Sequence, residues 1–238
     1  MGRAFEYRKA SKMKRWANMA KVFTKIGREI NIAIKDGVAD PAYNPRLRLA
    51  ILNARKANMP KANVDAAIKR ATSKDADDYQ EVVYEGYGPH GIAFLIETTT
   101  NNPTRTVANM RLYLNRSGGS LGTSGSVDYM FERKGMFRIK AEGQNPEELE
   151  FELIDFGLDE LRVEDDEIVL YTLFSEFGTM QKALEDRNIE VENAELIRLT
   201  NVTKKLNDEQ AEDLIKLIDK FDEDEDVANV FHTMDMNE

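Results

Sequence analysis

The sequence predicts an α+β protein with an N-terminal helical domain followed by two α+β (ferredoxin-like) domains, one inserted in the other. Three observations indicate this class. Up to residue 71, apolar residues recur at helical spacing. Beyond residue 80, short runs rich in Val, Ile and Phe alternate with helical stretches. Between residues 136 and 199 the expected order is β-α-β-β-α-β, which is the ferredoxin-like arrangement.

The N-terminal domain is expected over residues 1–78, with an arm followed by three helices. The helices are predicted at residues 20–35, 45–59 and 60–71. Asp36-Gly37 supplies a stop for the first helix. Asn44-Pro45 supplies an N-cap and a first-turn proline for the second. A polar stretch after the third helix is expected to be a linker.

The first α+β domain is expected to be discontinuous in sequence. Its first part is predicted as strands at 81–86 and 92–98, a helix at 103–115, a glycine-rich turn at 118–126 and a strand at 127–131. This β-β-α-β order is one helix short of a balanced two-layer unit. The end of the chain offers a helix at 208–221 and a strand at 227–232. The domain is therefore predicted to comprise residues 79–132 plus 203–238.

The inserted ferredoxin-like domain is predicted over residues 133–202. Its expected elements are a strand at 136–140, a helix at 146–156, strands at 161–163 and 168–172, a helix at 177–188 and a strand at 195–199. Each strand is short and rich in β-branched or apolar residues, and each helix has apolar residues at helical spacing.

Charge is distributed unevenly along the chain. The net charge is −10, but residues 1–75 hold 18 Lys and Arg against 6 Asp and Glu, so the remainder carries a net −22. A basic segment in an acidic chain indicates a polyanion as the partner of that segment. The alternative is that the basic part docks on the acidic part of the same chain or of another chain.

The composition excludes several classes of chemistry. The absence of cysteine excludes disulfides and thiolate chemistry and favours a cytoplasmic location. No apolar run approaches the roughly 18 residues that a membrane span needs, so no membrane partner is expected. Two histidines, His90 and His232, are too few for a typical zinc site. We therefore expect no enzyme, no catalytic, cofactor-binding or metal-binding residues and no small-molecule substrate.

Two glycine-rich segments and one acidic run resemble ligand-binding motifs without matching their context. Gly86–Gly91 has the letters of a dinucleotide fingerprint, but a strand-like run follows it, so a hairpin turn is expected. Gly118–Ser126 lacks a P-loop ending and is expected to be a connecting loop, with phosphate contact through its N–H groups as the alternative. Asp222–Asp226 lacks the spacing of a calcium-binding EF-hand loop, so a solvated acidic turn is expected.

The basic residues before position 75 remain as candidate nucleic-acid ligands, because each neutralised phosphate releases counterions. Arg48 and Arg55 are seven residues apart and therefore share a face of the second helix, with Asn44 one turn earlier. The full set is Arg8, Lys9, Lys12, Lys14, Arg15, Lys21, Lys25, Arg28, Arg46, Arg48, Arg55, Lys56, Lys61, Lys69 and Arg70. Aromatic side chains such as Trp16 could stack on bases or pack against neighbouring helices.

Several long runs carry a resemblance to a known family. They are KVFTKIGREI, NPRLRLAILNARKANMPKANVDAAIKRA, YEGYGPHGIAFLIETTTNNPTRTVANMR, GGSLGTSGSVDYMFERKG and LIDFGLDEL. These runs are similar to those of the YebC family, which is related to the mitochondrial translational activator of cytochrome c oxidase I. The resemblance implies a helical domain followed by two α+β domains, and it carries over no catalytic residues. Many members begin with Gly-His-Ser-Lys-Trp, whereas this chain begins MGRAFEYRKASKMKRW, so contacts of that usual start are not carried over.

The nature of the nucleic acid stays open at this point. The resemblance implies a DNA-binding transcriptional regulator, while some members look like ribosome-associated translation factors. Charge and shape slightly favour ribosomal RNA, or the ribosome, because the cations are spread over three helices and an arm. A duplex reader usually offers one recognition helix with several polar side chains aimed at base edges. Here Asn44 is expected to be occupied as a cap, which leaves Asn53.

Overall fold

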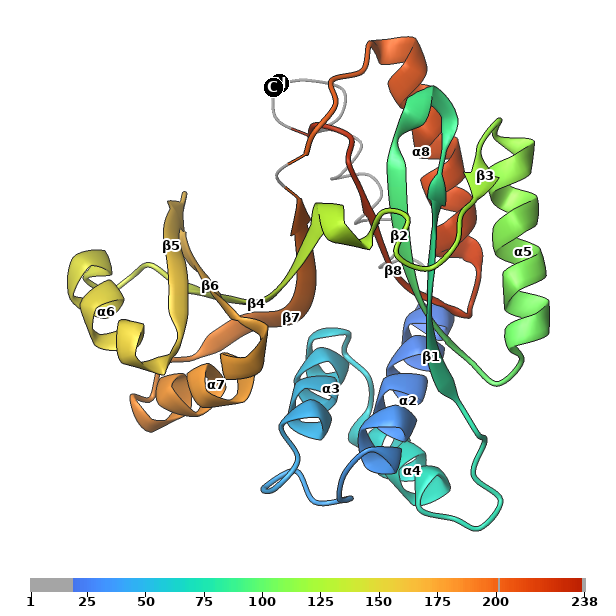
Figure 1. Ribbon diagram of the computed structural model, residues 1–238. Helices are drawn as coiled ribbons and strands as arrows, with labels where there is room; N and C mark the ends of the chain where they lie inside the picture. Colours follow the sequence, from blue (N-terminus) through green and yellow to red (C-terminus); the bar gives the residue numbers. More distant parts are fainter. Residues whose placement is uncertain (1–18, 201, 237–238) are drawn as a thin grey trace. The chain divides into compact units, whose positions relative to one another are not determined.

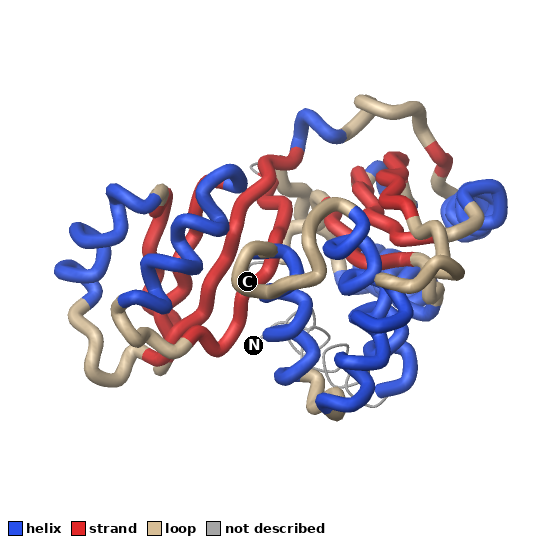
Figure 2. Tube along the Cα trace, turned by 90° about the horizontal axis from the view of Figure 1, so that it is seen from below, coloured by secondary structure: helices blue, strands red, loops and turns tan. Residues whose placement is uncertain are grey.

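The computed structural model describes residues 19–200 and 202–236 (Figure 1). The chain divides into two compact units, Met1–Phe131 with Thr200–Glu238, and Glu132–Leu199. Each unit contains one four-stranded antiparallel sheet with helices, and the first also contains an N-terminal helical region. Figure 2 shows the strands of the two sheets in red and the helices in blue. The predicted α+β class is confirmed.

The N-terminal helical region consists of the three predicted helices. They are α2 (Met19–Lys35), α3 (Pro45–Lys56) and α4 (Lys61–Ala71). Ile30, Leu47, Ala54 and Val64 bring their buried side chains into one core between them. Asn44 is the predicted N-cap of α3, and its Oδ1 accepts a hydrogen bond from the backbone N–H of Leu47 at 3.0 Å. Local capping and helical periodicity therefore fix this region.

The sheet of the first unit has the strand order β3-β1-β2-β8. Its strands are β1 (Gln80–Tyr87), β2 (Ala93–Thr100), β3 (Ser120–Leu121) and β8 (Val227–His232). Helices α5 (Pro103–Arg116) and α8 (Asp208–Glu223) join one face of it through a core that includes Phe94, Met110, Leu217 and Phe221. The end of the chain thus supplies the helix and the strand that the first part lacks.

One predicted strand of this sheet is wrong. Residues 127–131 were expected to form the third strand, but Asp128–Met130 is a 3₁₀ turn. The third strand is β3, which lies inside the predicted glycine-rich turn and pairs with β1. The reason is that the carboxylate of Glu85 accepts the backbone N–H groups of Val127 and Asp128. These donors are therefore not available to a sheet partner.

The second unit has the ferredoxin-like order that the sequence predicts. Its elements are β4 (Phe131–Lys140), α6 (Pro146–Leu153), β5 (Leu158–Glu164), β6 (Glu167–Leu173), α7 (Phe177–Asp186) and β7 (Val191–Thr200). The strands are arranged β5-β6-β4-β7, so the first and third strands of the unit are the central pair. Phe137 of β4 stacks on Phe177 of α7, with ring centroids 4.6 Å apart.

None of the helices in the described ranges combines the length and the apolar character that crossing a bilayer requires.

The second unit is expected to fold when it is produced alone, because its strands and helices share their own core. A fragment of residues 132–199 should give a cooperative thermal unfolding transition by circular dichroism. A fragment of residues 79–131 lacks α8 and β8, so buried residues such as Phe94 lose their contact with Phe221. This fragment should show no cooperative unfolding transition. Cooperative unfolding of the 79–131 fragment, or none in the 132–199 fragment, would contradict the proposed insertion.

Candidate nucleic-acid interface

Arg28, a predicted nucleic-acid ligand on α2, is buried. About 10% of its side chain is exposed. Its Nη1 donates to the carbonyl oxygens of Thr99 at 3.2 Å and Glu225 at 2.5 Å, and to Oδ1 of Asp226 at 2.9 Å. The guanidinium thus fastens α2 to the end of β2 and to the turn before β8. Its role is structural, and we remove it from the proposed phosphate contacts.

Asp226 joins Arg28 to the first turn of α5. Its Oδ2 accepts hydrogen bonds from Nη2 of Arg105 at 2.7 Å and from the hydroxyl groups of Thr106 and Thr100 at 2.8 and 3.2 Å. Burial by itself would raise the pKa of Asp226. The hydrogen bonds from Arg105 and Thr106, with the charges of Arg105 and Arg28, outweigh burial and hold that pKa below its ordinary value. The carboxylate is therefore ionised at neutral pH.

The prediction of a solvated acidic turn at residues 222–226 is wrong for two of its members. Asp226 has 3% of its side chain exposed. Asp224 accepts hydrogen bonds from Nδ2 of Asn109 at 3.0 Å and from the hydroxyl of Tyr113 at 3.1 Å. Within the described ranges, no group of three or more His, Asp or Glu side chains is placed to hold a metal ion. The turn is a structural joint between α5, α8 and α2.

Two further cations of the predicted set bind acceptors in the same chain. Nζ of Lys21 donates to the carbonyl oxygen of Glu223 at 3.2 Å. Arg46 forms ion pairs with Asp36, at 3.1 Å, and with Glu81. Lys21 and Arg46 therefore follow the alternative to a polyanion partner, in which basic residues bind acceptors of the same chain.

The pair Arg48 and Arg55, predicted to share a face of α3, differs in its surroundings. Nη1 of Arg48 donates to the carbonyl oxygens of Pro41 at 2.7 Å and Ala42 at 3.1 Å, which closes the loop before α3. Arg55 is exposed. Lys25 on α2 and Lys56 on α3 are half-buried. The structure does not bring the α2 and α3 cations into one free surface.

Four of the predicted residues remain exposed. We define the α3–α4 cation set as Arg55, Lys61, Lys69 and Arg70. No hydrogen bond or ion pair joins these side chains to another residue of the described ranges. They lie in the last turn of α3 and at both ends of α4. Exposed, unpaired cations on a firmly packed helical region can neutralise phosphates without first breaking internal ion pairs.

The predicted ligands Arg8, Lys9, Lys12, Lys14 and Arg15 lie outside the described residues, as does Trp16.

Both glycine-rich segments are structural, and the second contains an occupied anion site. Gly86–Gly91 lies at the turn between antiparallel β1 and β2, so the predicted hairpin is confirmed. In the second segment, the carboxylate of Glu85 accepts the backbone N–H groups of Gly125 at 2.7 Å, Val127 at 2.7 Å and Asp128 at 2.9 Å. These N–H groups form a nest of the kind that binds phosphate. The protein's own carboxylate fills it, which leaves the connecting loop as the correct interpretation.

Sequence reasoning missed Asp226 and Arg105, which organise the joint between α2, α5 and the turn before β8. Residues 222–226 are all acidic, so the sequence alone does not show which of the five carboxylates is buried. The only local signal is the apolar Val227 directly after Asp226, which marks the start of a strand.

Two family models together match nearly the whole chain. The model of the TACO1/YebC protein N-terminal domain matches residues 3–74, and that of the TACO1/YebC second and third domain matches residues 79–234. A probable transcriptional regulatory protein of Porphyromonas gingivalis is 58% identical over 235 residues, which cover 98% of this chain and 97% of that protein. A protein with the same description from Parabacteroides distasonis is 56% identical over 235 residues, with the same coverage.

A solved structure is similar as well. The crystal structure of a conserved hypothetical protein, Aq1575 from Aquifex aeolicus, matches with a TM-score of 0.80 and 35% sequence identity. The match covers 92% of this chain and 91% of that one. The arrangement of helices and sheets described above is thus shared with an experimentally determined relative.

Proposed function

Because the chain belongs to the TACO1/YebC family, as its sequence runs indicated, we propose that it is a non-enzymatic, nucleic-acid-binding regulator of gene expression. The relatives from P. gingivalis and P. distasonis are named probable transcriptional regulatory proteins, which makes duplex DNA the first candidate partner. The absence of cysteine supports a cytoplasmic location.

The observation that carries this proposal is the α3–α4 cation set. Its four side chains are exposed, while Arg28, Arg46 and Lys21 are held by acceptors elsewhere in the chain. Contacts within the chain therefore account for Arg28, Arg46 and Lys21. They do not account for the four cations of the α3–α4 cation set. Beyond residue 75 the chain carries a net −22, which would repel nucleic acid and direct it to the basic surface.

Ribosomal RNA is the second candidate, and the surroundings of Asn44 favour it. The side chain of Asn44 is buried; its Oδ1 caps Leu47, and its Nδ2 donates to the carbonyl oxygens of Ala33 and Val38. This amide cannot read a base edge. Helix α3 then offers the exposed Arg55 for a phosphate but few amides for direct readout, which fits recognition of an RNA surface by shape and charge.

Neutralising the α3–α4 cation set is expected to weaken nucleic-acid binding by on the order of 100-fold at low salt, because several phosphate contacts are lost together. The four-glutamine variant carries Arg55→Gln, Lys61→Gln, Lys69→Gln and Arg70→Gln. The matched control removes four exposed cations elsewhere and carries Arg111→Gln, Lys140→Gln, Lys182→Gln and Lys205→Gln. Fluorescence anisotropy with labelled duplex DNA and with labelled RNA measures both. An equal loss in the control would show that net charge, and not this surface, determines binding.

The two candidate partners are separated in cell lysate. If the protein is a ribosome-bound factor, the wild type co-sediments with ribosomes in a sucrose gradient and the four-glutamine variant stays at the top. If it is a transcriptional regulator, the wild type stays at the top and chromatin pull-down recovers discrete promoter fragments. If the wild type does not co-sediment with ribosomes and the pull-down recovers no promoter fragments, both forms of the proposal are contradicted.

A further inference from the structure

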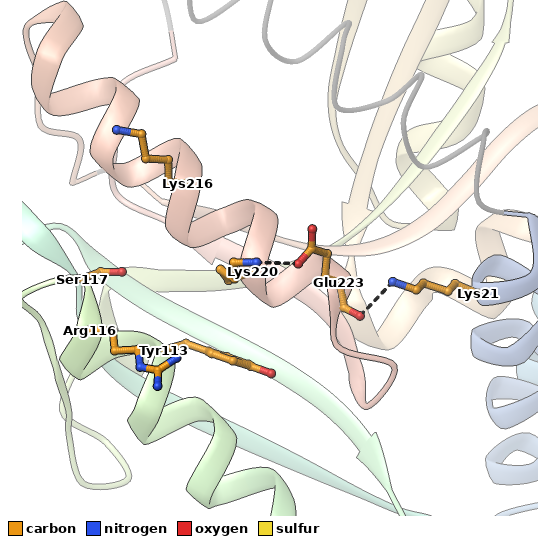
Figure 3. Close-up of a pocket in the computed structure, with 7 residues that line it drawn as sticks. All are labelled: Lys21, Tyr113, Arg116, Ser117, Lys216, Lys220 and Glu223. Atoms are coloured by element: carbon orange, nitrogen blue, oxygen red, sulfur yellow. Dashed lines mark hydrogen bonds and ion pairs between the residues drawn. The ribbon is translucent and has the colours of Figure 1, made fainter.

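A pocket of about 630 Å³ lies between α2, α5 and α8, and cations dominate its lining (Figure 3). The lining residues are Lys21, Tyr113, Arg116, Ser117, Lys216, Lys220 and Glu223. Four cations thus stand against one carboxylate, in a unit whose composition beyond the helical region is acidic. Three of the four, Arg116, Lys216 and Lys220, belong to α5 and α8, outside the basic segment that the sequence singled out.

Local helix chemistry explains only part of this cluster. Arg116 and Lys220 lie in the last turns of α5 and α8, where a cation offsets the helix dipole. Lys216 has no such position. It lies four residues before Lys220 on α8, an arrangement in which like charges on one helix face repel each other. Its contact with Asp213, at 3.6 Å between exposed groups, compensates little for that repulsion.

Arg116 and Lys220 have N–H donors that an anionic ligand can reach. Arg116 has no hydrogen bond or ion pair with any residue of the described chain. The Lys220 ammonium is 2.8 Å from Oε2 of Glu223, but both side chains are about 60% exposed, so an anionic ligand can compete for it. Nζ of Lys21 approaches from α2 to the carbonyl oxygen of Glu223 and adds a third cation from a separate helix (Figure 3).

Tyr113 forms a fixed, neutral wall of the pocket. Its hydroxyl donates to Oδ2 of Asp224 at 3.1 Å, and its ring packs edge-on against Phe221 with centroids 6.0 Å apart. Burial, together with the charge of Asp224 and the hydrogen bond to it, raises the pKa of Tyr113 to about 12. The phenol is therefore protonated at neutral pH and adds no negative charge to the pocket.

We propose that this pocket binds a small polyphosphate, the di- or triphosphate group of a nucleotide, through Arg116, Lys216, Lys220 and Lys21. Lysines act as point charges for phosphate oxygens, and an arginine can bind two of them at once. The volume lies within the range of roughly 300–1,000 Å³ that is typical of small-ligand sites. The cations that line the pocket come from three helices, whereas a nucleic-acid backbone is usually bound along an extended groove. The site shares no residue with the α3–α4 cation set.

Isothermal titration of the full chain with inorganic pyrophosphate and with ADP tests the proposal. Saturable binding of one ligand per chain is expected, and Arg116→Gln or Lys220→Gln should each weaken it about tenfold, because each loses a charged hydrogen bond. Arg111→Gln on α5 and Lys182→Gln on α7 are exposed controls outside the pocket and should bind as the wild type does. Lys216→Gln, which is on the surface of α8, serves as a third pocket variant should either of the first two unfold.

Three results would overturn the proposal. The first is the absence of saturable binding of pyrophosphate and ADP by the wild type. The second is an equal loss in the controls, which means non-specific attraction of anions. The third is a pocket variant that keeps pyrophosphate binding but loses binding of an oligonucleotide, which would make these cations part of the nucleic-acid interface. The four-glutamine variant of the α3–α4 cation set should keep pyrophosphate binding, so failure here is distinguishable from failure of the proposed function.

Discussion

Replacing Asp226 by alanine is expected to destabilise the first unit by about 3–5 kcal/mol, the cost of removing one partner from a buried charge network. The substitution leaves the guanidinium of Arg28 buried beside the carbonyl oxygens of Thr99 and Glu225 without its carboxylate. It also removes the acceptor of Arg105 and of the Thr106 hydroxyl. Urea unfolding, with amide hydrogen exchange of β2 and α5 to identify the unit that opens, measures the effect.

The control for Asp226→Ala is Glu225→Ala, which changes a neighbouring carboxylate that is 57% exposed and 3.7 Å from Arg28. Its expected cost is below about 1 kcal/mol, as for other exposed ion pairs. Comparable losses for the two substitutions would contradict the assignment of Asp226 as the buried joint.

The pH dependence of stability gives a second readout of Asp226. Its pKa in the folded protein lies below the ordinary value of 3.8, so its contribution is present above pH 3.8 and is lost as the pH falls through the folded pKa. An Asp226→Asn variant lacks this titration. The difference in the free energy of unfolding between wild type and Asp226→Asn should therefore shrink as the pH is lowered below 3.8, and a constant difference would contradict the ion pairing.

Replacing Glu85 by alanine is expected to cost about 1–3 kcal/mol, because the buried N–H of Val127 loses its acceptor. The part-buried N–H groups of Gly125 and Asp128 lose the same acceptor but can bind water instead. Glu85 is 4% exposed, and its acceptor role joins β1 to the loop before β4. Thermal unfolding measures the loss. Protease cleavage within residues 118–127 should also accelerate, since the loop would lose the contact that closes it.

The control on the same strand is Glu81→Ala. Glu81 pairs with Arg46 at the surface, and this exposed pair is expected to contribute less than about 1 kcal/mol. Glu85→Gln retains the size of the side chain and one acceptor oxygen, and its loss should lie between those of the two alanine variants. If Glu85→Ala were as stable as Glu81→Ala, the carboxylate would not be what holds the loop.

Much of the fold was predictable because its signals are local. The Asn44-Pro45 cap marks the start of α3, and the ferredoxin-like order of the second unit follows from its alternation of short strands and helices. Strand β3 was not predictable from two residues, Ser120 and Leu121. Its place depends on Gly86 of β1, where a Cβ would lie 2.6 Å from the carbonyl oxygen of Ser120. That close approach becomes evident only when the two segments are brought together.

The candidate site was predictable as a basic region but not residue by residue. Arg28 and Arg55 are both arginines on amphipathic helices, and nothing local distinguishes them. Arg28 is withdrawn from solvent because Asp226, 198 positions later, supplies its partner. A pairing at that separation leaves no periodic signal, so burial of a cation by a long-range carboxylate has to be seen in the structure.

The salt dependence of nucleic-acid affinity tests the central claim most directly. For the full chain, the slope of log K against log salt concentration is expected to be steeper than about −4, as for five or more phosphate contacts. In the four-glutamine variant of the α3–α4 cation set the slope should be shallower by about 3, while the control variant keeps the wild-type slope. A flat wild-type slope, or equal slopes in the wild type and the four-glutamine variant, would contradict the assignment of this surface to nucleic acid.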